Sequence, residues 1–126
     1  MIKKTILCID DSRMTVKLLR DTLASNPKYK DVVVHESNQG FNGISDIINY
    51  SPDLVFMDFE MPILNGLEAM SIIRQNPKYK DLDILFFSSK DNVFDKIRGT
   101  MIGGTEYFSK NTQRERLNEI FEKYLG

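Results

Sequence analysis

Five short apolar runs recur along this chain of 126 residues, and each is followed by a segment with helical spacing. The clearest run, Leu54 to Met57, ends in Asp58. A run that is apolar at every position, rather than at every second one, is typical of a strand buried on both faces. Such strands need helices on both sides, so the pattern predicts a parallel sheet in an α/β fold.

The order of these segments predicts the topology. Strands are expected at 5–9, 32–34, 54–58, 84–87 and 106–110. Ser12 is expected to cap the first helix, and prolines 27, 52 and 77 mark the ends of the first three. Further helices are expected at 92–102 and 113–125. Five strand–helix units at this length predict one domain, 1–126, with a doubly wound, flavodoxin-like sheet of order 2-1-3-4-5 and five helices.

Composition excludes several classes of function. A net charge of −1 argues against nucleic-acid or membrane binding through bulk charge. Cys8 is the only cysteine, so no disulfide framework is possible, and its apolar neighbours predict a buried thiol. No apolar run is long enough for a signal peptide or a membrane span, and a cytoplasmic location is therefore expected.

The hexapeptide Asn-Pro-Lys-Tyr-Lys-Asp occurs at 26–31 and again at 76–81. Each copy follows a helix and precedes a strand, so a helix stop with a polar turn explains both. A docking epitope with Tyr29 and Tyr79 exposed is the alternative interpretation.

Polar side chains follow the expected strands at one edge of the sheet. In the order 2-1-3-4-5 the strand order reverses between the first and third strands, where ligands of such sheets bind. The side chains predicted to meet there, or to reach the same edge from the fourth and fifth strands, are Asp10, Asp11, Asp58, Ser88, Ser89 and Lys110.

Three carboxylates this close repel one another unless a cation joins them, and oxygen ligands of this kind suit Mg²⁺. A lysine and a hydroxyl opposite the carboxylates indicate phosphoryl chemistry, with Asp58 as nucleophile and Ser88 as hydrogen-bond donor. Simpler interpretations remain for each residue alone. Asp11 and Ser88 could be helix caps, and Lys110 could form a plain ion pair with Asp58.

At these residues the sequence resembles the receiver domain of two-component response regulators, over essentially the whole chain. The acidic pair is Asp10-Asp11, the phosphoacceptor motif runs from Asp58 to Gly66, and the switch hydroxyl and lysine are Ser88 and Lys110. The spacing matches chemotaxis-type receivers. Residues 88–96 are also similar to single-domain receivers of twitching-motility (type IV pilus) chemosensory systems.

The resemblance implies that a sensor histidine kinase transfers a phosphoryl group to Asp58. It implies Mg²⁺ held by Asp11, Asp58, the backbone carbonyl of Glu60 and, through a water molecule, Asp10. Ser88 and Lys110 would then move inward and Tyr107 would rotate, remodelling the surface formed by residues 92–125 for an output protein. We expect no attached output domain and no enzymatic turnover of other substrates. We also expect the chain to be a monomer or a weak dimer.

The sequence departs from the family pattern beside the site. Asn111 follows Lys110 where the family usually has proline, often in a cis bond. A cis bond before a residue other than proline is costly, so we expect a trans bond here and a different aim for Lys110. Glu60 and Lys90 occupy positions that tune dephosphorylation, and we expect an ion pair between them. Gly104 replaces a usual alanine and, with Gly99 and Gly103, predicts a loosely held fourth helix.

Three other functions fit parts of the pattern. A degenerate receiver would act only as a docking module. A small Mg²⁺-dependent phosphatase would also use a strand-end aspartate, but it fits the Asp10-Asp11 pair poorly. A flavin-binding protein of the same fold would need a phosphate-binding loop after the first strand, and none is found there.

Overall fold

The computed structural model describes residues 2–10, 12–37, 40–58, 66–88, 103–110 and 114–126. Five strands form one sheet in the order β2-β1-β3-β4-β5, and every neighbouring pair is parallel. The predicted doubly wound topology is therefore confirmed. The strands are β1 Thr5–Ile9, β2 Val33–Ser37, β3 Leu54–Asp58, β4 Asp83–Ser88 and β5 Glu106–Ser109.

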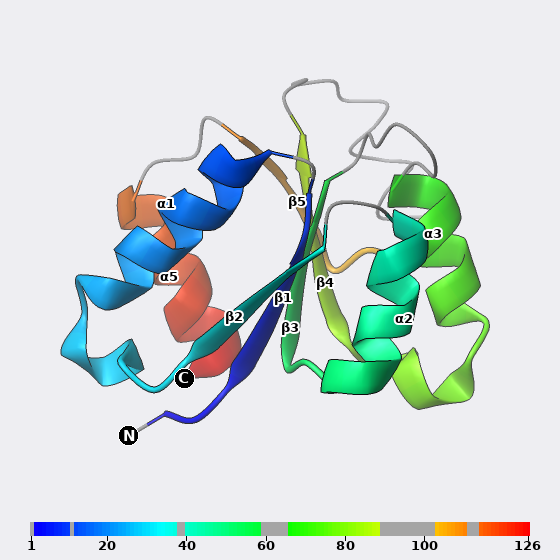
Figure 1. Ribbon diagram of the computed structural model, residues 1–126, viewed down its shortest axis with the longest axis horizontal. Coiled ribbons are helices and arrows are strands. Elements are labelled where there is room, and N and C mark those ends of the chain that lie inside the picture. The colour runs from blue at the N-terminus through cyan, green and yellow to red at the C-terminus, as the bar shows by residue number, and fades with distance from the viewer. Residues whose placement is uncertain (1, 11, 38–39, 59–65, 89–102, 111–113) are drawn as a thin grey trace.

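Helices cover both faces of the sheet (Figure 1). One face carries α1 (Arg13–Ala24) and α5 (Arg114–Leu125), and the other carries α2 (Gly40–Tyr50) and α3 (Gly66–Arg74). Each layer encloses its own core, one around Phe56 and Phe121 and one around Met57 and Met70. The fourth predicted helix, at 92–102, lies outside the described residues. Among the helices that the structure describes, none has the length and apolarity that crossing a membrane requires.

The sheet edges differ most from the sequence prediction. Strand β2 is not confined to 32–34 but extends through His35 and Glu36 to Ser37. His35 lies just beyond the predicted range of 32–34, yet it belongs to β2 and stacks on Tyr50 of α2 at a centroid distance of 3.8 Å. An edge strand has a neighbour on one side only, so polar residues are tolerated and the apolar run that marks a strand is cut short.

The two copies of the hexapeptide form matching 3₁₀ turns, η1 (Pro27–Tyr29) and η2 (Pro77–Tyr79). In each, the asparagine side chain accepts a 3.0 Å hydrogen bond from the backbone N–H of the lysine, Lys28 or Lys78. Tyr29 is only 1% exposed. The turn interpretation is therefore correct, and the epitope with both tyrosines exposed is wrong because Tyr29 belongs to the core.

Candidate phosphorylation site at the strand ends

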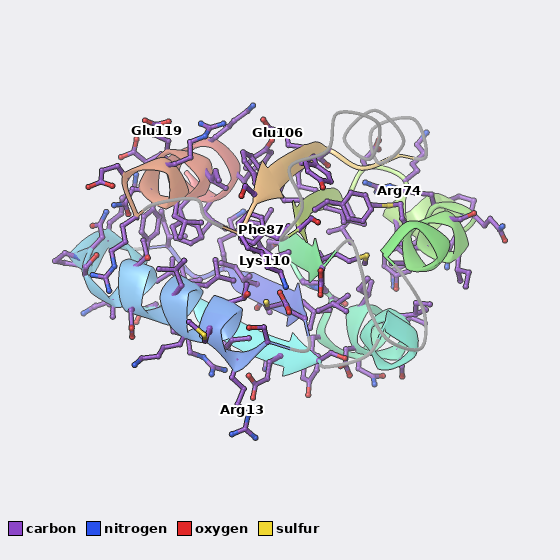
Figure 2. The ribbon with its side chains drawn as sticks, turned by 90° about the horizontal axis from the view of Figure 1, so that it is seen from above. Arg13, Arg74, Phe87, Glu106, Lys110 and Glu119 are labelled. Carbon is purple, nitrogen blue, oxygen red and sulfur yellow. The ribbon has the colours of Figure 1, made fainter. Side chains whose placement is uncertain are left out.

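Four of the predicted site residues lie at the carboxyl ends of neighbouring strands. Asp10 directly follows β1, Asp58 ends β3, and Ser88 ends β4. Lys110 follows β5, and its backbone N–H donates to the carbonyl of Ser88 at 2.8 Å, which extends the ladder by one residue. Figure 2 looks down on this edge and shows Lys110 over the strand ends, between the two helical layers.

Lys110 links the two carboxylates. Its Nζ atom lies 3.1 Å from Oδ2 of Asp10 and 3.3 Å from Oδ2 of Asp58. Oδ1 of Asp10 accepts hydrogen bonds from Lys110 Nζ, at 3.1 Å, and from the backbone N–H of Ser12, at 2.8 Å. Ser12 therefore directly precedes α1, as predicted, but it contacts the site through its backbone N–H, which donates to Asp10. Its side chain makes no capping bond within the described part of the chain.

The electrostatics of the site are unbalanced. Asp10 and Asp58 are 5% and 4% exposed, and the hydroxyl residue Ser88 is 1% exposed. Burial alone lowers the pKa of Lys110, but the hydrogen bond and charge of Asp10, together with Asp58, outweigh it and raise that pKa. The ammonium is therefore held in its charged form, and one positive charge faces two negative ones. A cation or an electrophile would relieve the remaining negative charge.

The donor set fits a hard divalent cation. Oδ2 of Asp10 is buried and accepts no hydrogen bond among the described residues, although Lys110 lies beside it. A buried carboxylate oxygen that accepts no hydrogen bond is well suited to coordinate a cation that prefers oxygen ligands, such as Mg²⁺. Within the described residues no group of three acidic, histidine or cysteine side chains is assembled, so the ion would need further ligands such as water or the adjoining segments.

Several predicted site residues fall in segments that the structure does not describe. They are Asp11, Glu60, Ser89, Lys90 and Asn111. The predicted third carboxylate, the carbonyl ligand, the Glu60–Lys90 ion pair and the aim of the Lys110–Asn111 loop therefore remain predictions, as does a loosely held fourth helix.

Tyr107 occupies an inward position on β5. Its side chain is 9% exposed and packs in the core around Met57 and Met70. In the register of the sheet, Tyr107 pairs with Phe86 of β4, two residues before Ser88. The predicted switch tyrosine and the predicted switch hydroxyl thus lie on adjacent strands.

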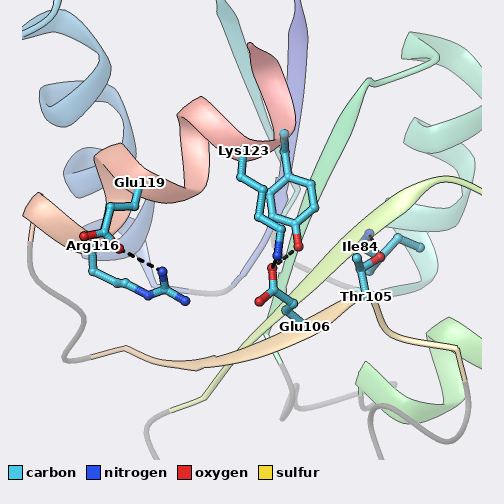
Figure 3. A network of polar contacts seen from close by, with 7 residues as sticks. Ile84, Thr105, Glu106, Arg116, Glu119 and Lys123 are labelled. Carbon is cyan, nitrogen blue, oxygen red and sulfur yellow. Dashed lines mark hydrogen bonds and ion pairs between the residues drawn. The ribbon is translucent and has the colours of Figure 1, made fainter.

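The other end of β5 is joined to α5 by a polar network (Figure 3). The Glu106 carboxylate accepts a hydrogen bond from the Tyr124 hydroxyl and pairs with Lys123 at 3.2 Å. On α5, Arg116 pairs with Glu119 at 2.9 Å. The two contacts of Glu106 tie the strand that carries Tyr107 to the last helix, whereas the Arg116–Glu119 pair lies within that helix.

Arg74 is a structurally important residue that the sequence analysis missed. Its guanidinium donates to the backbone carbonyls of Gly103, Tyr79 and Leu82, and so joins α3 to η2 and to the segment that enters β5. A basic residue at the end of a helix was the only signal in the sequence, and it indicates no particular partner.

Comparison with known proteins gives the class to which this fold and site belong. Residues 6–122 match the family model of the response regulator receiver domain. The chain belongs to this family and therefore to two-component signalling. Within the family it matches the chemotaxis-type receivers.

Two curated proteins match most of this chain. Protein PilG of Pseudomonas aeruginosa is 31% identical over 112 residues, which cover 89% of this chain and 80% of PilG. The sensor histidine kinase CheAY of Helicobacter pylori is 29% identical over 122 residues, which cover 95% of this chain but 15% of the kinase.

Solved structures confirm the fold. The Mn²⁺-bound response regulator Rcp1 has a TM-score of 0.83 at 21% identity, covering 97% of this chain and 94% of that one. Chemotaxis protein CheY4 of Vibrio cholerae has a TM-score of 0.83 at 22% identity, covering 97% and 98%. The Saccharomyces cerevisiae complex of phosphotransfer protein Ypd1 with the Ssk1 receiver domain matches with a TM-score of 0.84 at 20% identity, covering 98% and 90%.

Proposed function

We propose that this chain is a phosphorylation-activated switch whose phosphoacceptor is Asp58. The observation that carries the proposal is the ammonium of Lys110 between the buried carboxylates of Asp10 and Asp58, next to Ser88. A sensor histidine kinase, or a phosphotransfer protein of the kind complexed in the Ypd1 structure, would be the donor. The P–N bond of its phosphohistidine breaks as a bond forms between phosphorus and a carboxylate oxygen of Asp58.

Each residue of the site has a task in this transfer. Lys110 neutralises charge on the phosphoryl oxygens, and Ser88 donates a hydrogen bond to one of them. Asp10, Asp11, Asp58 and the carbonyl of Glu60 would hold Mg²⁺. When bound, the ion supplies electrostatic stabilisation of the phosphoryl group. The Mn²⁺-bound structure of Rcp1 supports this choice, as does the buried Oδ2 of Asp10, which accepts no hydrogen bond among the described residues.

The signal would pass along β5. Phosphorylation adds a charge of roughly −1.5 to −2, which draws Ser88 and Lys110 toward Asp58. Tyr107 is already buried without phosphorylation, so we expect a shift of population toward a preferred arrangement rather than a rotation into an empty space. The surface of residues 92–125, of which 103–110 and 114–125 are described, would then bind an output protein.

Glu60 and Lys90 would set the lifetime of the acyl phosphate by hindering the approach of water. A Glu60→Ala, Lys90→Ala double variant should lose its phosphoryl group faster than the unmodified chain. An unchanged lifetime would contradict this part of the proposal.

Amide NMR of the isotope-labelled chain tests the switch. With Mg²⁺ and phosphoramidate, a small donor with a P–N bond, resonances of Ser88, Tyr107 and the α5 residues should shift and return as the acyl phosphate hydrolyses. In Asp58→Asn only the metal-dependent shifts should remain. Phosphorylation that leaves β5 and α5 unmoved would overturn the output route. Absence of any donor-dependent shift would instead favour a module that only docks.

A further inference from the structure

Strand β2 and helix α1 enclose a groove in a part of the chain that is described without gaps, residues 12–37. Two hollows of about 320 and 200 Å³ form the groove, and Arg20 lines both of them. Arg13 and Glu36 also line the first hollow, and Val32 lines the second. The groove therefore follows β2 along its length, at the edge of the sheet that lies opposite β5.

The charged side chains of the groove are mostly basic. Four cations and two acids line it: Arg13, Lys17, Arg20 and Lys30, with Asp21 and Glu36. Arg20 and Glu36 face each other at 3.9 Å, whereas the other three cations are exposed and form no ion pair with any described residue. Figure 2 shows Arg13 extended into solvent from the start of α1. In a chain with a net charge of −1, this local excess of positive charge attracts acidic groups.

The edge of β2 also offers backbone hydrogen-bonding groups. The N–H of Val33 and the carbonyl of Ser37 bond to residues at the two ends of β1. Because backbone groups alternate in direction along a strand, those of Val34 and Glu36 point away from β1. The Arg20 guanidinium donates a 2.9 Å hydrogen bond to the carbonyl of Val34. No described strand pairs with this edge, so the remaining outward groups are available to an added strand.

Arg20 determines which chains can pair with this edge. A bare edge strand can pair with any extended chain, and a charged side chain laid across it prevents such pairing. A carboxylate of an incoming chain would form a bidentate pair with the guanidinium. Arg20 would then release the carbonyl of Val34, which could accept a hydrogen bond from the incoming backbone. Arg20 therefore favours an acidic segment over a neutral one.

The second hollow is lined largely by apolar side chains. Leu23, Tyr29, Val32 and Val34 are among its lining residues, and Lys30 lies beside them. A surface that binds nucleic acid or lipid through charge has no need of an apolar half, nor of acidic side chains among its cations. The groove instead fits a peptide with apolar side chains at one end and carboxylates at the other.

We propose that the groove between α1 and β2 binds an extended acidic segment of a partner protein, which adds to the sheet as a further strand beside β2. Carboxylates of this segment would pair with Arg13, Lys17 and Arg20, and its apolar side chains would occupy the second hollow. Since β2 and β5 are the two edges of the sheet, the bound segment leaves the β5–α5 surface accessible. The chain would thus be held by one partner while its opposite edge serves another.

Fluorescence anisotropy of labelled peptides with the full chain tests the proposal. The peptides are about eight residues long, enough to span β2, with valines at one end and glutamates at the other, in both chain directions. One direction should bind saturably between about 10 µM and about 1 mM, and more weakly at high salt. Replacing the glutamates by glutamines should weaken binding at least about tenfold, because the carboxylates no longer pair with the cations.

The repeated hexapeptide supplies a matched control. Lys30→Glu, in the groove, should weaken binding, whereas Lys80→Glu, at the same place in the second copy, should not. Arg13→Glu combined with Lys17→Glu should weaken binding of the glutamate peptide at least about tenfold and strengthen binding of a peptide with lysines in their place. That gain guards against a variant that merely misfolds.

Amide hydrogen exchange distinguishes strand pairing from simple attraction between charges. The bound peptide should slow the exchange of the Val34 and Glu36 amides, whose N–H groups point outward. Unchanged exchange at both amides, or no saturable binding by either peptide, would overturn the proposal. So would equal losses in the Lys30 and Lys80 variants. Phosphatidylglycerol vesicles that bind as strongly as the peptides, and that lose binding in the Arg13/Lys17 variant, would also overturn it and indicate a lipid surface.

Discussion

The Nζ atom of Lys110 lies 3.3 Å from Oδ2 of Asp58, so the cation proposed to stabilise a phosphoryl group already neutralises its acceptor. The same atom contacts Asp10 at 3.1 Å. A divalent ion bound by these two carboxylates would therefore compete with Lys110 for them. The affinity of the site for Mg²⁺ should therefore depend on Lys110.

Lys110→Met should strengthen Mg²⁺ binding while destabilising the metal-free protein. The variant leaves two buried carboxylates without their cation, which costs about 1–3 kcal/mol for a partly exposed lysine. Mg²⁺ should then raise the melting temperature of the variant more than that of the unmodified chain. Lys123→Met, which removes an exposed ion pair with Glu106, should leave the Mg²⁺ effect unchanged. Equal Mg²⁺ effects in Lys110→Met and the unmodified chain would contradict the competition.

Arg74→Lys should destabilise the fold by about 2–4 kcal/mol, because one ammonium cannot serve three carbonyls on separate segments. Space at Gly103 is also set by this side chain, since a Cβ there would lie 3.0 Å from Cγ of Arg74. Arg116→Lys makes the same change in an exposed ion pair and should cost at most about 0.5 kcal/mol. Urea unfolding of both variants provides the comparison, and equal losses would show that Arg74 does not hold these segments together.

The two tyrosines of the repeated hexapeptide should respond differently to truncation. Tyr29→Ala should cost about 3–5 kcal/mol, because the ring is buried and packs edge-on against Phe121 at 6.0 Å. Tyr29→Phe should be neutral or slightly stabilising, since the Tyr29 hydroxyl is buried without a hydrogen-bond partner among the described residues. Tyr79→Ala should cost less than Tyr29→Ala, because Tyr79 is only half-buried. Thermal unfolding measures all three, and a destabilised Tyr29→Phe would indicate a hydrogen bond to that hydroxyl.

Stability should fall at alkaline pH through Cys8. Burial first, and the nearby charge of Asp10 second, raise the pKa of this thiol far above its ordinary value of 9.0. The unfolded chain therefore loses the thiol proton above pH 9.0 while the native chain keeps it, so the native state is progressively disfavoured. Cys8 should contribute a loss of about 1.4 kcal/mol for each pH unit above that point.

Cys8→Val isolates this contribution from that of the other groups that titrate in the same range. The difference in unfolding free energy between the two chains should change with pH only above the ordinary thiol pKa. A difference that stays constant would mean that the thiolate is tolerated in the native core.

The sequence predicted the central strands better than the edges. β1, β3 and β4 each have a neighbour on both sides and a helical layer on both faces, so their apolar runs are continuous. The outer strand β2 continues through His35, Glu36 and Ser37, where no apolar signal remains. Asp10, Asp58, Ser88 and Lys110 were predictable because parallel strands bring their carboxyl ends to one edge.

Long-range side-chain contacts could not be predicted in the same way. Arg74 is held by carbonyls, which every residue carries, so no residue pattern identifies its partners. Tyr29 and Tyr79 have the same local sequence and the same 3₁₀ turn, yet they pack in opposite layers and differ in burial. Local sequence determined the turn, whereas the path of the whole chain determined the burial.

Intact-mass spectrometry after incubation with acetyl phosphate tests the central claim most directly. The unmodified chain should gain one phosphoryl group in the presence of Mg²⁺ and none when the metal is chelated. Asp58→Asn should gain none under either condition, while Asp53→Asn, an acid at the opposite end of β3 whose carboxylate accepts a hydrogen bond from the backbone of Thr5, should be modified normally. A phosphoryl group that persists on Asp58→Asn, or an unmodified native chain in the presence of Mg²⁺, would contradict Asp58 as a working phosphoacceptor.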